Sequence, residues 1–100
     1  MRIISRKKLV EYWQKYPDTE QTLTAWYQEA RAAEWTGPQD IKNRYGNASI
    51  VGNNRVVFNI RGNKHRLIDA VAYQYGTIFI KFIGTHVEYD KIDATTVEME

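Results

Sequence analysis

A histidine and a tyrosine stand three residues apart in the stretch "IGTHVEYD" at 83–90, directly after the alternating run "TIFIKF". Histidine suits proton transfer near neutral pH, and tyrosine can stack on a base or donate a proton. If a helical turn forms there, His86 and Tyr89 lie on the same side and could reach one phosphate. The alternatives are an exposed turn histidine and a tyrosine that packs the C-terminal residues onto a sheet.

The net charge of +2 hides an uneven distribution of charge along the chain. Residues 46–84 carry five basic side chains against the single acid Asp69, whereas residues 85–100 carry five acids against the single base Lys91. A basic block on predicted strands indicates an anionic partner. The alternative is the ordinary solvated charge of a sheet surface.

Composition limits the classes of protein to which the chain can belong. One hundred residues with 43% hydrophobic residues are enough for one domain, 1–100, with a proper core. The chain has no cysteine, so it has no disulfide and no Cys-based zinc site, and we expect no metal or other cofactor. It has no apolar run of the roughly 20 residues that a membrane span needs, and its first residues lead us to expect no secretory signal. We therefore expect a cytoplasmic protein that does not bind membranes.

The first half of the chain predicts a short strand followed by two helices. "RIIS" at 2–5 reads as a strand that ends at Ser5, a good helix N-cap. Helix 6–16 has apolar residues at helical spacing and stops at Pro17, and Asp18 with Gln21 predicts a capping box for the next helix. We expect these helices to form a hairpin on one face of a sheet, with their aromatic side chains in the core rather than in a base-stacking platform: Trp13, Tyr16, Trp26 and Tyr27.

The second half predicts an antiparallel meander. The polar residues 39–54 read as a loop with a short helical turn, and "RVVFNI" at 55–60 reads as a strand. The Gly-Asn pair in "RGNK" at 61–64 predicts a hairpin turn into a strand over 65–75. In the last strand, alternation places 78, 80 and 82 on one face and 79, 81 and 83 on the other. The fold class is therefore α+β, in the order β-α-α-β-β-β.

The segments "VVFNIRGNKHRLI" at 56–68 and "IFIKFIGTHVEYDKI" at 78–92 resemble the HigB toxins of bacterial type II toxin–antitoxin pairs. These toxins belong to the RelE-like group of mRNA-cleaving toxins. The resemblance covers essentially the whole chain, and its most specific pieces are the "FNI-x-GN-x-x-RL" hairpin and the "GTH-x-EYD" end. It implies a RelE-like fold and an mRNA interferase that cuts mRNA during translation in the ribosomal A site. It also implies a HigA-like antitoxin with a helix-turn-helix, whose complex with the toxin binds operator DNA and represses the operon.

Metal-free RNA cleavage needs a base for the 2′-OH proton, an acid for the leaving oxygen and cations around the phosphorane. We expect His86 to transfer the proton and Arg66, which matches a phosphate-binding arginine of RelE-like toxins, to stabilise the charge. Tyr89 and Lys81 complete the candidate catalytic set. Many RelE-like toxins carry lysines where Val57 and Asn59 stand, so the base is left open between His86 and a carboxylate.

Four further residues form the candidate RNA-binding set. Asn59 matches the "FN" of the family, and alternation is expected to place the side chains of 55, 59 and 61 on a common face. The set comprises Arg55, Asn59, Arg61 and Lys64.

Two charged positions on the return strand are expected to face away from Arg66. His65 precedes Arg66 and so points to the opposite face, which predicts a structural role. Asp69 should then face the helices, where a carboxylate without a partner is costly. A bulge or a bond from the Trp13 or Trp26 indole would relieve that cost, and the sequence does not choose between them.

Two other classes of function remain open. A non-catalytic module could inhibit translation by binding RNA or the ribosome, and an interaction domain could dock an acidic protein on the basic face. DNA-directed functions are weaker, because the sequence shows no recognition helix and no carboxylate–metal cluster.

Overall fold

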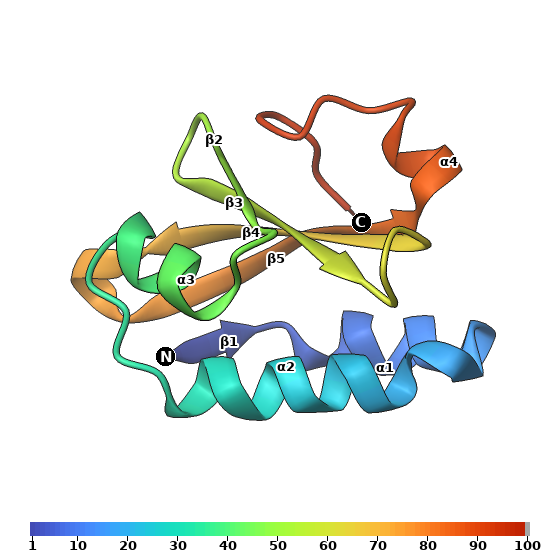
Figure 1. Ribbon diagram of the computed structural model, residues 1–100, viewed down its shortest axis with the longest axis horizontal. Coiled ribbons are helices and arrows are strands. Elements are labelled where there is room, and N and C mark those ends of the chain that lie inside the picture. Colours follow the sequence, from blue (N-terminus) through green and yellow to red (C-terminus); the bar gives the residue numbers. More distant parts are fainter. Residues whose placement is uncertain (100) are drawn as a thin grey trace.

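The computed structural model describes residues 1–99 and contains a five-stranded mixed sheet of order β1-β5-β4-β3-β2. Helices α1 and α2 cover one face of the sheet, and the chain after β5 crosses the other face (Figure 1). This arrangement confirms the predicted α+β class. The elements are β1 (Arg2–Ile4), α1 (Arg6–Lys15), α2 (Glu20–Ala32), α3 (Pro38–Arg44), β2 (Ser49–Val51), β3 (Arg55–Ile60), β4 (His65–Ala72), β5 (Thr77–Thr85) and α4 (His86–Tyr89), with 3₁₀ turns at Pro17–Thr19 and Tyr73–Tyr75.

The predicted meander of β3, β4 and β5 is present, and β1 extends it by pairing in parallel with β5. The β3–β4 hairpin closes at the pair Ile60 and His65. Arg61 and Gly62 in its turn adopt the left-handed conformation, with φ of 55° and 67°. Glycine takes this conformation without steric cost, whereas an arginine there is held by the turn.

Several boundaries in the first half of the chain differ from the prediction. Asp18 forms no capping box: it lies in a 3₁₀ turn, and α2 starts at Glu20 with Thr19 as its N-cap. The segment predicted as a loop contains a full helix, α3, and the strand β2, which pairs with Arg55–Val57. No helix within residues 1–99 is long and apolar enough to cross a membrane.

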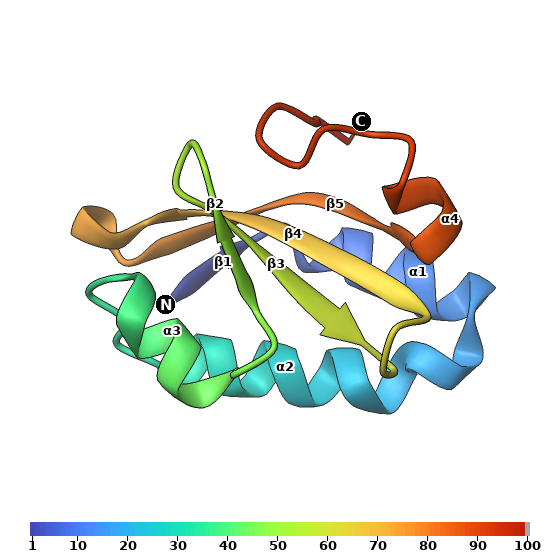
Figure 2. The same cartoon turned by 45° about the horizontal axis from the view of Figure 1, so that its top comes forward.

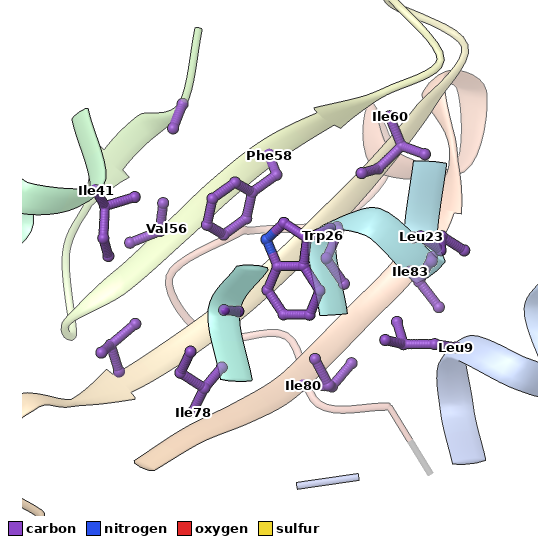
Figure 3. Packing of buried hydrophobic residues seen from close by; sticks show 14 of the residues in the cluster. Leu9, Leu23, Trp26, Ile41, Val56, Phe58, Ile60, Ile78, Ile80 and Ile83 are labelled. Atoms are coloured by element: carbon purple, nitrogen blue, oxygen red, sulfur yellow. The ribbon is translucent and has the colours of Figure 1, made fainter. Parts of the chain in front are cut away.

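The main core lies between the helices and the sheet. Leu9 from α1 and Leu23 and Trp26 from α2 pack against the inward side chains of the sheet, which include Phe58 and Ile80 (Figure 3). The Trp26 and Phe58 rings meet edge to face with centroids 5.5 Å apart. The expectation that the helical aromatics are core residues is confirmed for Trp26, while Trp13, Tyr16 and Tyr27 are partly buried and pack against the core.

A β-bulge in β5 reverses the faces on which Phe82 and Ile83 were expected to lie. Ile68 pairs with Phe82 while the next residue, Asp69, pairs with Ile80, so Lys81 is the additional residue on β5. A bulge places consecutive side chains on one face. Phe82 consequently lies on the face opposite the helices, and Ile83 belongs to the main core.

The face opposite the helices carries a second, smaller apolar cluster. Its buried members are Val57, Ile68 and Phe82. Residues 90–99, named here the C-terminal segment, cross this face above the sheet and contribute Ile92, Ala94 and Val97 to the cluster (Figure 2). The polar face expected for an open antiparallel sheet is therefore partly covered.

Candidate functional site

Arg66 and Tyr89 meet at the end of the sheet face opposite the helices. The Arg66 guanidinium lies 5.5 Å from the centroid of the Tyr89 ring. Its Nη1 donates to the carbonyl oxygens of Asn63 at 2.9 Å and His65 at 3.2 Å, which fixes the side chain against the β3–β4 turn. Arg66 remains only partly buried. A cation held in place over an aromatic ring can bind a phosphate while the ring contacts a base.

Helix α4 presents His86 beside this pair. Thr85 caps the helix: the Glu88 backbone N–H donates to Thr85 Oγ1 at 3.2 Å, and the Thr85 N–H donates to Glu88 Oε1 at 2.8 Å. The hydrogen bond from the Thr85 backbone holds the pKa of Glu88 below its usual range. The His86 N–H donates to the Lys64 carbonyl at 2.9 Å, which ties α4 to the β3–β4 turn. The expected helical turn is thus present, and Glu88 has a structural role in it.

The His86 ring is open to solvent and has a carboxylate nearby. Its side chain is 53% exposed, and its Nδ1 lies 3.5 Å from Asp90 Oδ2. A histidine whose orientation is set by a carboxylate is suited to accept and donate a proton. Geometry therefore permits the proton-transfer role expected of His86.

Gly84 belongs to β5, which ends at the next residue, Thr85. It pairs with Arg66 across β4 and β5. A Cβ on Gly84 would lie 2.5 Å from Phe82 Cζ, so the Phe82 ring lies directly over the glycine. The missing side chain gives Phe82 the space to complete the apolar cluster next to Arg66.

Lys81 lies on the same face, further from α4, and is paired with the C-terminal segment. Its Nζ is 3.1 Å from Oε1 and 3.0 Å from Oε2 of Glu98. The Lys81 side chain is only a quarter exposed. The hydrogen bond from Lys81 is the main reason why the pKa of Glu98 is low. Lys81 thus lies on the expected face, but its ammonium is paired with a carboxylate of the same chain.

Arg55 is enclosed by the C-terminal segment, which corrects its expected exposure on an open face. It is 6% exposed, and its Nη1 donates to the carbonyls of Ala94 at 3.2 Å and Val97. Its Nη2 lies 3.2 Å from Glu98 Oε1. The guanidinium therefore fixes the C-terminal segment to the sheet and is not available to RNA in this conformation.

The three other candidates for RNA binding occupy different surroundings. Asn59 is exposed and pairs with Arg66 across β3 and β4, so the two residues are cross-strand neighbours. Arg61 does not share its face, because the left-handed turn directs its Nε to Asp18 Oδ2 at 3.7 Å, on the helical side. Lys64 is exposed in the same turn. Lys64 is joined directly to α4, because its backbone carbonyl accepts a hydrogen bond from the His86 N–H.

His65 is buried on the helical side, as the strand alternation predicts. It is 5% exposed, and its Nδ1 lies 2.6 Å from the Tyr12 hydroxyl. Burial lowers the pKa of His65 and raises the pKa of Tyr12. A neutral imidazole whose Nδ1 accepts from the hydroxyl keeps its proton on Nε2, which faces Asp18 Oδ2 at 3.9 Å. The sequence reveals no sign of this Tyr12–His65 bond, because the two residues are distant along the chain.

Asp69 faces the helices and is fully buried. Neither of its oxygens, nor the Trp26 indole N–H, has a hydrogen-bond partner among residues 1–99. Burial raises the pKa of Asp69 well above its usual range, which favours the protonated, neutral form of the side chain. The suggested indole bond is therefore absent from the described structure, and neutralisation reduces the cost of burial instead.

The structure thus assembles Arg66, Tyr89 and His86 at one end of the sheet and places Lys81 with Arg55 further along the same face. Within residues 1–99 no group of three or more His, Cys, Asp or Glu side chains could hold a metal ion. The arrangement offers a cation, an aromatic ring and a proton-transfer group within one local region. These are the components that phosphodiester cleavage through a neighbouring hydroxyl requires.

A mixed sheet of this order, with a helical hairpin on one face, is consistent with the fold of the RelE-like toxins. The family model HigB_toxin, described as the RelE-like toxic component of a toxin–antitoxin system, matches residues 19–92. The chain therefore belongs to the HigB toxin family. It is also 28% identical over 94 residues to a protein of Escherichia coli O6:H1 (strain CFT073) named mRNA interferase HigB, covering 92% of this chain and 91% of that protein.

Proposed function

We propose that this protein is the toxin of a type II toxin–antitoxin system and acts as a metal-independent endoribonuclease on mRNA in the cytoplasm. The observation that carries the proposal is the Arg66–Tyr89 pair beside the exposed His86. Membership of the HigB toxin family and the name of the E. coli relative support it. We further propose that cleavage occurs on translating ribosomes.

The reaction uses the 2′-OH of the nucleotide before the scissile bond. Its oxygen attacks the adjacent phosphorus, the bond from phosphorus to the 5′-oxygen breaks, and the products are a 2′,3′-cyclic phosphate and a free 5′-OH. His86 moves a proton at this centre, and Arg66 stabilises the additional negative charge on the phosphorane. Tyr89 supports the guanidinium with its ring and offers a surface to the neighbouring base. Because DNA lacks the 2′-OH, this mechanism selects RNA.

We propose a HigA-like antitoxin with a helix-turn-helix as the partner that neutralises the toxin. The description of the family as one component of a toxin–antitoxin system supports a partner of this kind. In this proposal, operator DNA is bound only by the complex of the two proteins, which represses the operon.

Inducible expression in a bacterium without the antitoxin tests the proposal. Growth is followed while the 5′ ends of mRNA are mapped, for wild type and for His86→Ala. Val87→Ala is the matched control, because Val87 is an exposed neighbour in the same helix. We expect wild type and Val87→Ala to arrest growth and cut mRNA, and His86→Ala to do neither. Arrest with intact mRNA would contradict cleavage and favour a protein that inhibits translation by binding alone.

A further inference from the structure

The sheet face that carries Arg66 continues beyond the C-terminal segment to an open, aromatic end. Phe79 on β5 pairs with Ala70 on β4, so its ring lies on the face opposite the helices. It is 37% exposed, although β5 is flanked by β1 and β4 in the sheet. A shallow cavity of about 280 Å³ lies over this end, lined by Asn53, Asn54, Ala70, Val71, Ala72, Phe79 and Lys81.

A cation lies next to the exposed ring. Lys81 Nζ is 5.7 Å from the centroid of Phe79 and is held at the same time by Glu98 at 3.0 Å. The alanines of β4 leave the ring face uncovered, because their side chains end at Cβ. An accessible aromatic face with a lysine at its side matches the requirements of one nucleotide, whose base stacks and whose phosphate binds the ammonium.

The position of this ring relative to Arg66 favours RNA over other ligands. Arg66 pairs with Gly84 on β5, and Gly84 is five residues from Phe79 along that strand, which is roughly 16 Å of extended chain. A single strand of RNA whose scissile phosphate lies at Arg66 could therefore reach Phe79 with a flanking nucleotide. An acidic peptide would use Lys81, but it would gain little from the flat aromatic face.

We propose that Phe79 and Lys81 form a second RNA-binding subsite that holds a nucleotide flanking the scissile bond. The inference rests on the proposed ribonuclease function. In the free protein Glu98 neutralises Lys81, and a phosphate of the RNA replaces the Glu98 carboxylate when the strand binds. Glu98 is 62% exposed at its side chain and also contacts the buried Arg55, so in this exchange Arg55 keeps its hydrogen bonds to the carbonyls of Ala94 and Val97.

Binding of a short 2′-O-methyl RNA, which cannot be cleaved through its 2′-oxygen, tests the subsite by fluorescence anisotropy at low salt. Phe79→Leu keeps an apolar side chain and removes the ring, whereas Phe79→Tyr keeps the ring. We expect Phe79→Leu to bind on the order of tenfold more weakly, and Phe79→Tyr to bind as wild type does. Glu98→Gln should bind more tightly than wild type, because Lys81 loses its competing partner.

Ile50→Ala is the control, because Ile50 is exposed and pairs with Val56, whose side chain lies in the core on the helical face. It should bind as wild type does, and the Phe79 and Ile50 variants should unfold within a few degrees of wild type. Glu98→Gln also removes the carboxylate beside the buried Arg55, so its thermal unfolding is measured before its binding is compared. Equal binding by Phe79→Leu and Phe79→Tyr would overturn the subsite, even if wild type cleaves mRNA in the expression assay. If wild type neither binds the RNA nor cleaves mRNA, both the subsite and the proposed function fail. If only Glu98→Gln changes binding, Lys81 contacts the RNA without a base stacked on Phe79, and the proposed subsite is overturned.

Discussion

The guanidinium of Arg66 lies 5.5 Å from the centre of the Tyr89 ring, so strand β4 and helix α4 are joined at the point where the sheet meets solvent. The contact aligns two side chains from distant parts of the sequence. Its geometry also explains why Tyr89 belongs both to the apolar cluster under the C-terminal segment and to the candidate site. One face of the ring can therefore support the cation while the remainder packs.

Replacing Arg66 with alanine should reduce mRNA cleavage by about a hundredfold or more, since a preorganised charge at the reacting phosphate is lost. Arg66→Lys should recover only part of the activity, because an ammonium cannot bind two phosphate oxygens as a guanidinium does. The measurement is the rate of cleavage in a translating extract. Arg31→Ala, on the exposed surface of α2, is the control and should behave as wild type. Full activity of Arg66→Ala would remove this residue from the site.

Tyr89→Phe distinguishes the contribution of the Tyr89 ring to activity from that of its hydroxyl. The contact with Arg66 involves the ring, so Tyr89→Phe should retain most of the activity, whereas Tyr89→Ala should lose it. The same cleavage assay measures both variants, with far-UV circular dichroism as a check of folding. If Tyr89→Phe is as inactive as Tyr89→Ala, the hydroxyl takes part in proton transfer.

Asp69 should make the protein less stable as the pH rises. Its pKa is raised in the folded state, so the folded protein keeps a proton that the unfolded chain loses above a pH of about 4. The free energy of unfolding should therefore fall with pH above that point, by at most about 1.4 kcal/mol per pH unit, until the folded-state pKa is reached. Urea denaturation from pH 5 to pH 9 measures this dependence.

Asp69→Asn is the variant that isolates this effect, because it keeps the shape and removes the titration. Its stability should change less between pH 5 and pH 9 than that of wild type. A variant that shows the same loss as wild type would mean that another group is responsible.

His65 should make the protein less stable as the pH falls into the mildly acidic range. Burial lowers its pKa, so the unfolded chain takes up a proton first as the pH falls. The stability from this residue is complete above a pH of about 6.5 and is lost as the pH falls through the lower folded-state value. His65→Asn offers an oxygen that can accept from the Tyr12 hydroxyl, and it cannot titrate. Thermal unfolding between pH 5 and pH 7 should vary less for this variant than for wild type.

Thr85→Ala should loosen α4 and with it His86 and Tyr89. The loss of an N-cap typically costs about 1 kcal/mol, and in so short a helix we expect the cost to appear as reduced activity. Thr85→Ser keeps the capping oxygen that accepts from the Glu88 N–H and serves as the control. Cleavage that is slowed equally by both variants would exclude the cap as the cause.

The fold could be predicted because the apolar periods of its elements are clear. Helices α1 and α2 and the hairpin of β3 and β4 follow from helical spacing, strand alternation and a Gly-Asn turn. The opposite facing of Arg66 and His65 follows from alternation alone. The faces of Phe82 and Ile83 could not be predicted, because the bulge depends on how β5 pairs with β4 and leaves no local pattern.

The candidate site was harder to predict, because its surroundings also depend on contacts between distant parts of the chain. Alternation places Arg55 on the correct face, but nothing local to its strand indicates that the C-terminal segment covers that face. Arg61 departs from alternation because its backbone is left-handed. The Arg66–Tyr89 contact joins two residues whose separate importance is suggested by family motifs, while their meeting depends on the tertiary fold.

The bulge at Lys81 also has a consequence for how related chains should be compared. Ile80 and Phe82 lie on opposite faces on either side of it, so deleting Lys81 would leave an uninterrupted alternation in which the remaining side chains keep their faces. The lysine is therefore an insertion that adds a positive charge without removing any apolar side chain from the core. A relative with one residue fewer at this point would keep the same sheet and lack the cation, and a single gap in the alignment would identify it.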